Sequence, residues 1–189
     1  MRATRVGDAL AVLFDRDGTL VVDVPYNTDP DLVEPMPTAT AAVAALRAAG
    51  VKVGVVSNQS GVARGLITPA QLGAVNARVE EIFGPFDTWQ VCPHGPDDGC
   101  PCRKPQPGLV LAGAAALGVD PVDVVVVGDI GSDMGAAAAA GARAVLVPTA
   151  VTRTEEVQRA PATAATLAEA VASILAARPA AGAGTPGVG

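Results

Sequence analysis

The feature that most constrains the fold of this chain is the alternation of short, strongly apolar runs with longer amphipathic segments. Five apolar runs occupy the ranges Ala9–Phe14, Val51–Val56, Thr88–Cys92, Val122–Val127 and Ala144–Val147. Runs as apolar as these are typical of strands that a parallel sheet buries on both faces. The sequence therefore predicts an α/β fold, a doubly wound parallel sheet of the Rossmann-like kind with helices on both faces.

Five further segments are predicted to be helical, and most of them carry end signals. They cover the ranges Thr38–Ala49, Thr68–Phe83, Pro107–Leu117, Ser132–Ala140 and Thr163–Ala177. The second begins with a capping box and a proline at the first helical position, and a glycine follows three of the others. We expect one domain over residues 1–189, with a core of residues 9–178 and a disordered tail at 179–189 that is rich in Ala, Gly and Pro.

Composition and charge exclude several classes of partner. The chain has 189 residues, 50% of them hydrophobic, and a formal net charge of −6. A nucleic-acid binder needs a basic face that displaces counterions, so we expect no nucleic-acid partner. No apolar stretch reaches the roughly 18 to 20 residues of a membrane span. No apolar signal core follows Met1–Arg5 either, so we expect no membrane partner and a cytoplasmic location.

The strongest chemical motif comes directly after the first apolar run, as Asp15-Arg16-Asp17-Gly18-Thr19. One carboxylate of such a pair can act as a nucleophile while the other moves protons. A turn that merely happens to contain Asp and Gly is the alternative interpretation, since both are common turn residues.

Acidic residues also follow the fourth apolar run, where Gly128-Asp129 precedes Asp133. Asp129 and Asp133 could simply cap a helix. In a parallel sheet, however, these carboxylates would lie near Asp15, and such a cluster is electrostatically unfavourable unless a cation lies in it. Oxygen ligands of this kind suit Mg²⁺.

Two polar segments are candidates for binding phosphate. Ser57-Asn58-Gln59-Ser60-Gly61 follows the second run and offers hydroxyl, amide and backbone N–H groups, although an ordinary polar turn would look the same. Lys104, one of only two lysines in the chain, follows Arg103. Its ammonium group could neutralise charge between a phosphate and the carboxylates.

All three cysteines and the only histidine lie within eleven residues, as Cys92, His94, Cys100 and Cys102. Three thiolates and one imidazole make a tetrahedral zinc set with no open position, so a zinc ion here would be structural. A disulfide is the alternative, but it would leave one cysteine unpaired, and cytoplasmic reduction disfavours it. We expect zinc to stabilise a loop that also fixes Lys104, two residues after Cys102.

Together these motifs resemble those of the haloacid dehalogenase superfamily of phosphotransferases. Their order, spacing and strand context agree with that superfamily from about residue 10 to 148. The aspartate pair matches the first motif, Ser57 the second, Lys104 the third, and Asp129 with Asp133 the fourth.

The resemblance implies a mechanism. Asp15 attacks phosphorus, and Asp17 acts first as general acid and then as general base. Mg²⁺ is held by Asp15, by the backbone carbonyl of Asp17 and by Asp129, with Asp133 in support. The residues of the second and third motifs hold the transferring phosphoryl group.

The zinc loop and the segment that follows the second run narrow the resemblance to the bacterial heptose-bisphosphate phosphatases, which are relatives of the histidinol phosphatases. A minimal cap and a small phosphorylated sugar as partner are thereby implied. The implied substrate-binding residues are Asp23, Tyr26, Ser57, Asn58, Gln59, Ser60, Arg64, Arg103 and Lys104. Two features depart from the heptose enzymes. The short gap between His94 and Cys100 is equally typical of histidinol phosphatases, and Ile130 stands where a basic residue is common.

The function implied is removal of the C7 phosphate of D-glycero-D-manno-heptose 1,7-bisphosphate, in the supply of nucleotide-activated heptose. Hydrolysis of histidinol phosphate is one alternative, and a catalytically inactive, zinc-containing binding module is the other. The presence of Asp15, Asp17, Lys104 and Asp129 together favours an enzyme, because a binding module has no need of all four. A minimal cap leaves the site open, so we expect a monomer.

Overall fold

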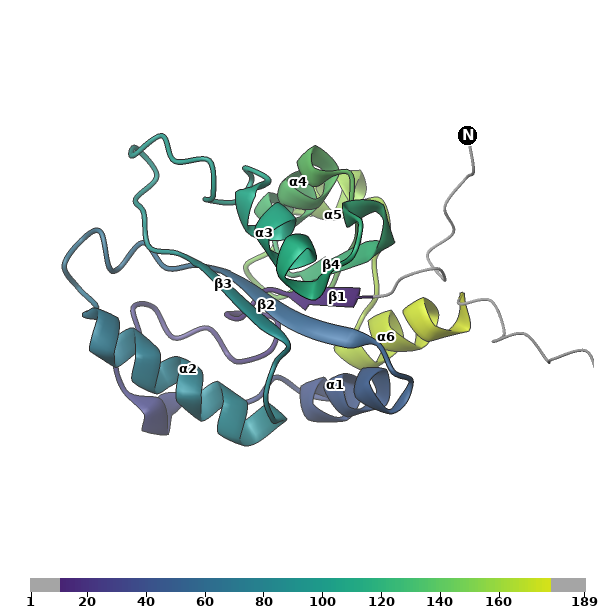
Figure 1. The fold of residues 1–189 in the computed structure, drawn as a ribbon, viewed down its shortest axis with the longest axis horizontal. Helices are drawn as coiled ribbons and strands as arrows, with labels where there is room; N and C mark the ends of the chain where they lie inside the picture. Colours follow the sequence, from purple (N-terminus) through teal and green to yellow (C-terminus); the bar gives the residue numbers. More distant parts are fainter. Residues whose placement is uncertain (1–10, 178–189) are drawn as a thin grey trace, which may run out of the picture.

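The computed structural model describes residues 11–177, which form a five-stranded parallel sheet with helices on both faces (Figure 1). The strands are β1 (Ala11–Phe14), β2 (Lys52–Asn58), β3 (Thr88–Cys92), β4 (Val124–Gly128) and β5 (Arg143–Leu146). The helices are α1 (Ala39–Ala48), α2 (Pro69–Phe83), α3 (Gly108–Leu117), α4 (Gly131–Ala140), α5 (Thr154–Arg159) and α6 (Leu167–Ala176). Two short 3₁₀ helices, η2 (Pro30–Leu32) and η3 (Pro121–Asp123), lie between them.

The sheet is ordered β3-β2-β1-β4-β5, so the chain winds outward from β1 in one direction and from β4 in the other. Helices α1, α2 and α6 cover one face, and α3, α4 and α5 cover the other (Figure 1). The four side chains of β1 alternate between the two cores and are fully buried. This arrangement is the doubly wound parallel sheet that the apolar runs predict.

Element boundaries differ from the sequence prediction where a local turn or a tertiary contact competes with the pattern. The fourth strand begins at Val124 and not at Val122, because Pro121 opens η3. The last helix begins at Leu167 and not at Thr163. Residues 162 and 164 instead hydrogen-bond to the backbone of Leu146 at the end of β5, which holds this segment extended. Helix α5 was not predicted, because it has only six residues and buries none of them.

Three predictions extend beyond the described residues. The start of the first strand at Ala9 and the disordered tail at 179–189 lie outside them, as do both ends of the expected single domain. Among residues 11–177, no helix is both long enough and apolar enough to cross a membrane.

The topology brings three loops together at the carboxyl edge of the sheet. Strands β1 and β4 are neighbours at which the winding direction reverses, and β2 lies on the other side of β1. In sheets of this kind the crevice beyond this switch point is the usual ligand site. The residues that follow these strands, Asp15, Gln59 and Asp129, therefore lie around a common space.

Candidate active site

Three buried carboxylates form the centre of the site. Asp15 follows β1, Asp129 follows β4, and Asp133 lies in the first turn of α4. An oxygen from each lies within 4.8 Å of the others, and all three residues are less than 8% exposed. The parallel sheet thus brings together the acidic residues of the first and fourth motifs.

Lys104 is the cation that partly compensates this cluster. Its Nζ donates to Asp15 Oδ1 at 2.8 Å, to Asp133 Oδ1 at 2.6 Å and to the carbonyl oxygen of Val56 at 2.9 Å. Lys104 is only 4% exposed, and the two carboxylates raise the pKa of its ammonium group. All three of its N–H donors are used, which fixes the charge at one position.

Asp133 is held so that it orients Lys104. Its second oxygen, Oδ2, accepts a hydrogen bond from the backbone N–H of Ile130 at 3.3 Å. Gly128 leaves room for this arrangement, because a Cβ atom there would lie 2.3 Å from the Asp133 carboxyl group. Each oxygen of Asp133 thus has a hydrogen-bond partner, and the residue holds Lys104 in place beside Asp15.

The other two carboxylates are electrostatically strained. Burial and the neighbouring carboxylates raise the pKa of Asp15 well above its ordinary value, even though Lys104 opposes the shift. Burial, and then the charge of Asp133, raise the pKa of Asp129 to about 7. Three carboxylates share one lysine here, and a divalent cation beside Asp15 and Asp129 would favour their ionised forms.

Asp17 lies at the rim of this cluster and points toward a different set of partners. Arg16 donates from Nε to Asp17 Oδ1 at 3.0 Å and from Nη2 to Asp17 Oδ2 at 3.0 Å. Gln59 Nε2 donates to the same Oδ2 at 2.8 Å and to Ser57 Oγ at 2.8 Å. Because Ser57 accepts this bond, its own hydroxyl hydrogen can be donated to a ligand.

Gly18, at φ +77°, allows the chain to turn after Asp17 and to pass close to Asp129.

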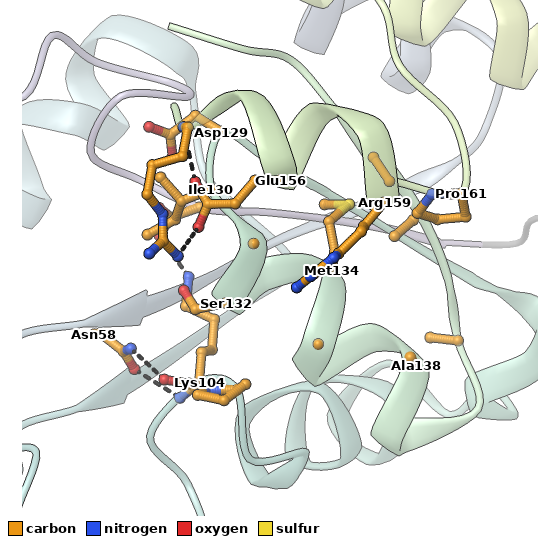
Figure 2. A pocket seen from close by; sticks show the side chains of 18 of the residues that line it. Asn58, Lys104, Asp129, Ile130, Ser132, Met134, Ala138, Glu156, Arg159 and Pro161 are labelled. Atoms are coloured by element: carbon orange, nitrogen blue, oxygen red, sulfur yellow. Dashed lines mark hydrogen bonds and ion pairs between the residues drawn. The ribbon is translucent and has the colours of Figure 1, made fainter. Parts of the chain in front are cut away.

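Asn58 joins the second motif to the third. Its Nδ2 donates to the carbonyl oxygen of Lys104 at 3.1 Å, and its Oδ1 accepts from the backbone N–H of Lys104 at 3.0 Å. Figure 2 draws this reciprocal pair at one end of a pocket. The predicted phosphate-binding segment and the predicted lysine are therefore fixed to each other.

The site opens into a cavity of about 1340 Å³ (Figure 2). Its lining includes Asp15, Asp17, Asp23, Lys104 and Asp129, together with Arg103, Ile130 and Arg153. Arg103 also donates from Nη1 to the carbonyl oxygen of His94 at 3.3 Å. The structure thus brings Arg103 both to the cavity and to the cysteine-containing loop.

A smaller cavity of about 220 Å³ adjoins Asp17 on its other side. Five of the predicted substrate-binding residues line it, namely Asp23, Tyr26, Asn58, Gln59 and Ser60, and two of these, Asp23 and Asn58, line the larger cavity as well. The Arg64 guanidinium lies over the Tyr26 ring, 5.8 Å from its centroid. Arg64 is therefore next to this cavity without lining it.

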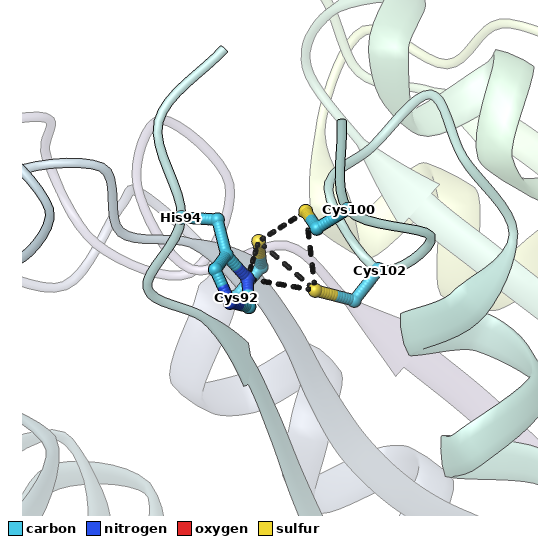
Figure 3. A group of neighbouring side chains, drawn as sticks. All are labelled: Cys92, His94, Cys100 and Cys102. Carbon is cyan, nitrogen blue, oxygen red and sulfur yellow. Dashed lines mark hydrogen bonds between the residues drawn. The ribbon is translucent and has the colours of Figure 1, made fainter. Parts of the chain in front are cut away.

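The cysteines and the histidine come together where β3 ends, with Cys92 as the last residue of the strand and the other three in the loop that leads to α3 (Figure 3). The three sulfur atoms are 3.2 to 3.7 Å apart, and His94 Nδ1 lies 3.2 Å from Cys102 Sγ and 3.5 Å from Cys92 Sγ. Sulfurs bound to one zinc ion at ~2.3 Å in a tetrahedron would be about 3.8 Å apart. All three cysteines are free, so the cluster has the composition and nearly the size of a tetrahedral metal site.

The cysteine-containing loop is bonded to the segment after β2. Gln59 donates its backbone N–H to the carbonyl oxygen of Cys92 at 2.7 Å, and Ala63 donates to that of Pro93 at 3.1 Å. An ion bound by the cysteines would therefore restrict the motion of Gln59 through this hydrogen bond. It would also restrict Lys104, which follows Cys102 by two residues.

The sequence reasoning missed two residues that contact this network. Arg16 lies between the two aspartates of the first motif, and Asn76 lies in the middle of α2. Arg16 Nη1 donates to Asn76 Oδ1 at 2.7 Å across a separation of 60 residues. No local pattern identifies such a pair, because Asn76 is an ordinary residue on a helix face.

Comparison with known proteins gives consistent results. Residues 101–174 match the family model described as HAD-hydrolase-like, where HAD stands for haloacid dehalogenase. The D-glycero-β-D-manno-heptose-1,7-bisphosphate 7-phosphatase of Pseudomonas aeruginosa is 41% identical over 143 residues, which cover 73% of this chain and 80% of that protein. The enzyme of the same name from Bordetella bronchiseptica is 40% identical over 143 residues, with 73% and 80% covered.

Solved structures agree with these relatives. The D,D-heptose 1,7-bisphosphate phosphatase of B. bronchiseptica, complexed with magnesium and phosphate, superposes with a TM-score of 0.79 at 35% identity. The match covers 88% of this chain and 98% of that one. The corresponding phosphatase of Burkholderia thailandensis has a TM-score of 0.64 at 26% identity, with 87% and 97% covered.

Proposed function

Because this chain belongs to the D-glycero-β-D-manno-heptose-1,7-bisphosphate 7-phosphatase family of HAD-like hydrolases, we propose that it removes the C7 phosphate of that sugar bisphosphate. The observation that carries the proposal is the buried Lys104, whose Nζ bridges Asp15 and Asp133 beside Asp129. A fixed ammonium group next to a buried carboxylate nucleophile suits phosphoryl transfer, where positioning and charge neutralisation provide most of the catalysis.

Mg²⁺ fits this carboxylate cluster. Asp15 and Asp129 offer hard oxygen ligands, and their raised pKa values indicate that a cation is needed to keep both ionised. We assign the ion to Asp15, Asp129 and the backbone carbonyl of Asp17, with Asp133 supporting through Lys104. Bound Mg²⁺ would neutralise charge on the phosphoryl group and on the attacking carboxylate.

In the first half of the reaction, Asp15 is the nucleophile. Lys104 holds Oδ1 of Asp15, which leaves Oδ2 to attack phosphorus and form an aspartyl-phosphate. Asp17 donates a proton to the C7 oxygen as the P–O bond breaks. The Ser57 hydroxyl can donate to an oxygen of the transferring group, while the buried charge of Lys104 beside Asp15 offsets the negative charge of that group.

In the second half, Asp17 serves as the base. Having given up its proton, it takes one from a water molecule, which attacks the aspartyl-phosphate and releases inorganic phosphate. Arg16 and Gln59 donate three hydrogen bonds to the oxygens of Asp17 and so hold its carboxyl group in place for this step.

The substrate is held by residues around the two cavities. Asp23, Tyr26, Asn58, Gln59 and Ser60 line the smaller one and would contact the sugar. Arg103 and Arg64 are the candidate cations for the second phosphate, Arg103 from the wall of the larger cavity and Arg64 from beside Tyr26. Arg153 also borders the larger cavity, next to Ile130, where a basic residue is common in the heptose enzymes.

The cysteine cluster binds a structural zinc ion in this proposal. Cys92, His94, Cys100 and Cys102 are four ligands and leave no open position, so zinc takes no part in the reaction. Its role is to order the loop that carries Arg103 and Lys104. The enzyme acts as a cytoplasmic monomer in this proposal, and size-exclusion chromatography with light scattering tests the monomer.

A panel of phosphate esters tests the function. We expect purified protein with Mg²⁺ to release phosphate from D-glycero-β-D-manno-heptose 1,7-bisphosphate with a higher kcat/KM than from histidinol phosphate. Chelation of Mg²⁺ should abolish turnover of both. A preference for histidinol phosphate would overturn the assignment, and no release from any ester would favour a binding module.

A further inference from the structure

Arg16 is a buried cation that connects Asp17 to helix α2. The residue is only 2% exposed, and its guanidinium binds both oxygens of Asp17 through Nε and Nη2. The remaining nitrogen, Nη1, donates to Asn76 Oδ1 at 2.7 Å. A guanidinium is a planar, rigid fork, so a carboxylate bound to two of its nitrogens is fixed in plane and direction.

Asn76 holds the Arg16 guanidinium in one orientation by accepting this hydrogen bond. It lies in the middle of α2. Its neighbours on this helix, Val75 and Val79, are buried in the core on the face of the sheet that α1, α2 and α6 cover. A buried guanidinium nitrogen without an acceptor carries a desolvation cost, so removal of the Asn76 oxygen would favour a different orientation of Arg16. The orientation of Asp17 therefore depends on a helix that does not itself reach the reacting atoms.

We propose that Arg16 and Asn76 are positioning residues that aim the Asp17 carboxyl group at the leaving-group oxygen. Gln59 adds a further contact, because its Nε2 donates to Asp17 Oδ2 and to Ser57 Oγ. Proton transfer to a leaving oxygen depends strongly on the direction of the donor, so a loose Asp17 transfers its proton less well. This inference rests on the proposed function, in which Asp17 is the general acid.

The experiment compares two leaving groups in the variant Asn76→Ala. The sugar oxygen of heptose 1,7-bisphosphate leaves as a poor alkoxide and needs a proton, whereas p-nitrophenolate leaves without one. The ratio kcat/KM reports the steps up to formation of the aspartyl-phosphate, so it isolates the acid role of Asp17. We expect kcat/KM to fall on the order of tenfold for the heptose ester and less than about twofold for p-nitrophenyl phosphate.

Two further variants sharpen this comparison. Asn76→Asp keeps an oxygen that can accept from Arg16 and should restore activity on the heptose ester. Arg78→Ala removes an exposed ion pair with Glu81 on the same helix and should leave both substrates unaffected. If Asn76→Ala does not fold, Arg16→Lys replaces the fork by a single nitrogen, and the same selective loss is expected.

An equal loss on both substrates, or no loss on either, would overturn the inference while leaving the proposed function intact. Failure of the unmodified enzyme to hydrolyse either ester would instead refute the proposed function, and the inference with it. A selective loss that Asn76→Asp rescues supports the positioning role, because a general weakening of the fold would not distinguish the two leaving groups.

Discussion

At the scale of single residues, the proposed reaction depends on Asp15, because Lys104 binds one of its two carboxylate oxygens and leaves the other for attack on phosphorus. Lys104 donates to Oδ1 of Asp15, and Asp15 lines the larger cavity. In Asp15→Asn the side chain keeps its volume but cannot attack phosphorus. We expect kcat to fall on the order of a thousand-fold or more.

Circular dichroism and a thermal melt provide the control for this variant. Loss of one charge relieves repulsion in the carboxylate cluster, and Lys104 keeps Asp133 as its partner, so the fold should persist. Retention of a tenth of the original kcat in Asp15→Asn would contradict a covalent mechanism through this residue.

The raised pKa values predict how Mg²⁺ binding depends on pH. In the folded metal-free protein the pKa of Asp129 is about 7, against 3.8 for an ordinary aspartate, so the folded state binds more protons than the unfolded state between these values. The stability of the metal-free protein should therefore fall as pH rises through this window. Mg²⁺ needs the ionised carboxylates, so its affinity should rise over the same window.

Thermal melts with and without Mg²⁺ at pH 6 and pH 8 measure this dependence. We expect the increase in Tm on adding a fixed concentration of Mg²⁺ to be larger at pH 8, since the stabilisation by a ligand follows its affinity. The same increase at both pH values would show that the carboxylates do not exchange protons for the metal.

At the scale of elements, the loop between β3 and α3 depends on its cluster of cysteine and histidine. Between β3 and α3 the only buried side chain is that of Lys104, and of the four candidate ligands only Cys92, at the end of β3, is buried. Purified protein should contain about one zinc ion per chain, and Cys100→Ser should reduce that content and lower Tm by roughly 5 °C or more.

Elemental analysis and thermal melts provide the measurement, and Asp97→Ser is the matched control. Asp97 lies exposed in the same loop and is not a ligand, so its substitution should leave both zinc content and Tm unchanged. Protein that is purified without chelators and contains no zinc would refute the metal assignment.

At the scale of the whole molecule, selectivity depends on cations that different loops bring to one cavity. Arg103 lines the larger cavity and donates to the backbone of His94, so it could serve either the substrate or the loop. Histidinol phosphate has one phosphate and a cationic amine, whereas the heptose ester has two phosphates. We expect Arg103→Ala to reduce the preference for the heptose ester on the order of tenfold, since a charge-assisted contact contributes about 1.5–3 kcal/mol.

The ratio of the two kcat/KM values is the measurement, with Arg103→Lys as a variant that keeps the charge. Arg103→Lys should retain part of the preference, because a point charge still attracts the second phosphate. Equal losses on both substrates in Arg103→Ala would assign this residue to the loop and not to substrate selection.

Much of the fold and of the candidate site was predictable, because the signals for both are local. Buried parallel strands are apolar on both faces, so the valine run before Gly128 indicates a strand without any knowledge of its neighbours. Asp15 and Ser57 follow such runs directly, and the cysteines and His94 lie within eleven residues of one another. The capping box at Thr68 likewise gives the observed start of α2.

The parts that could not be predicted depend on partners distant in sequence. Residue 164 pairs with the backbone of Leu146 and so delays the last helix, although its own sequence favours an earlier start. The sequence assigns Asp133 a supporting role beside the metal ligands, and only the structure shows how it acts, with one oxygen bound to Lys104 and the other to the backbone N–H of Ile130.

The amino-acid sequence by itself determined which elements form and which side chains follow them, because hydrophobic period, caps and turns act over a few residues. Only the tertiary structure decided how those side chains share their hydrogen bonds. Lys104 meets Asp15 across 89 residues, and Arg16 meets Asn76 across 60. Such contacts depend on how two distant segments pack and on which buried donor lacks another acceptor, and no short stretch of sequence contains that information.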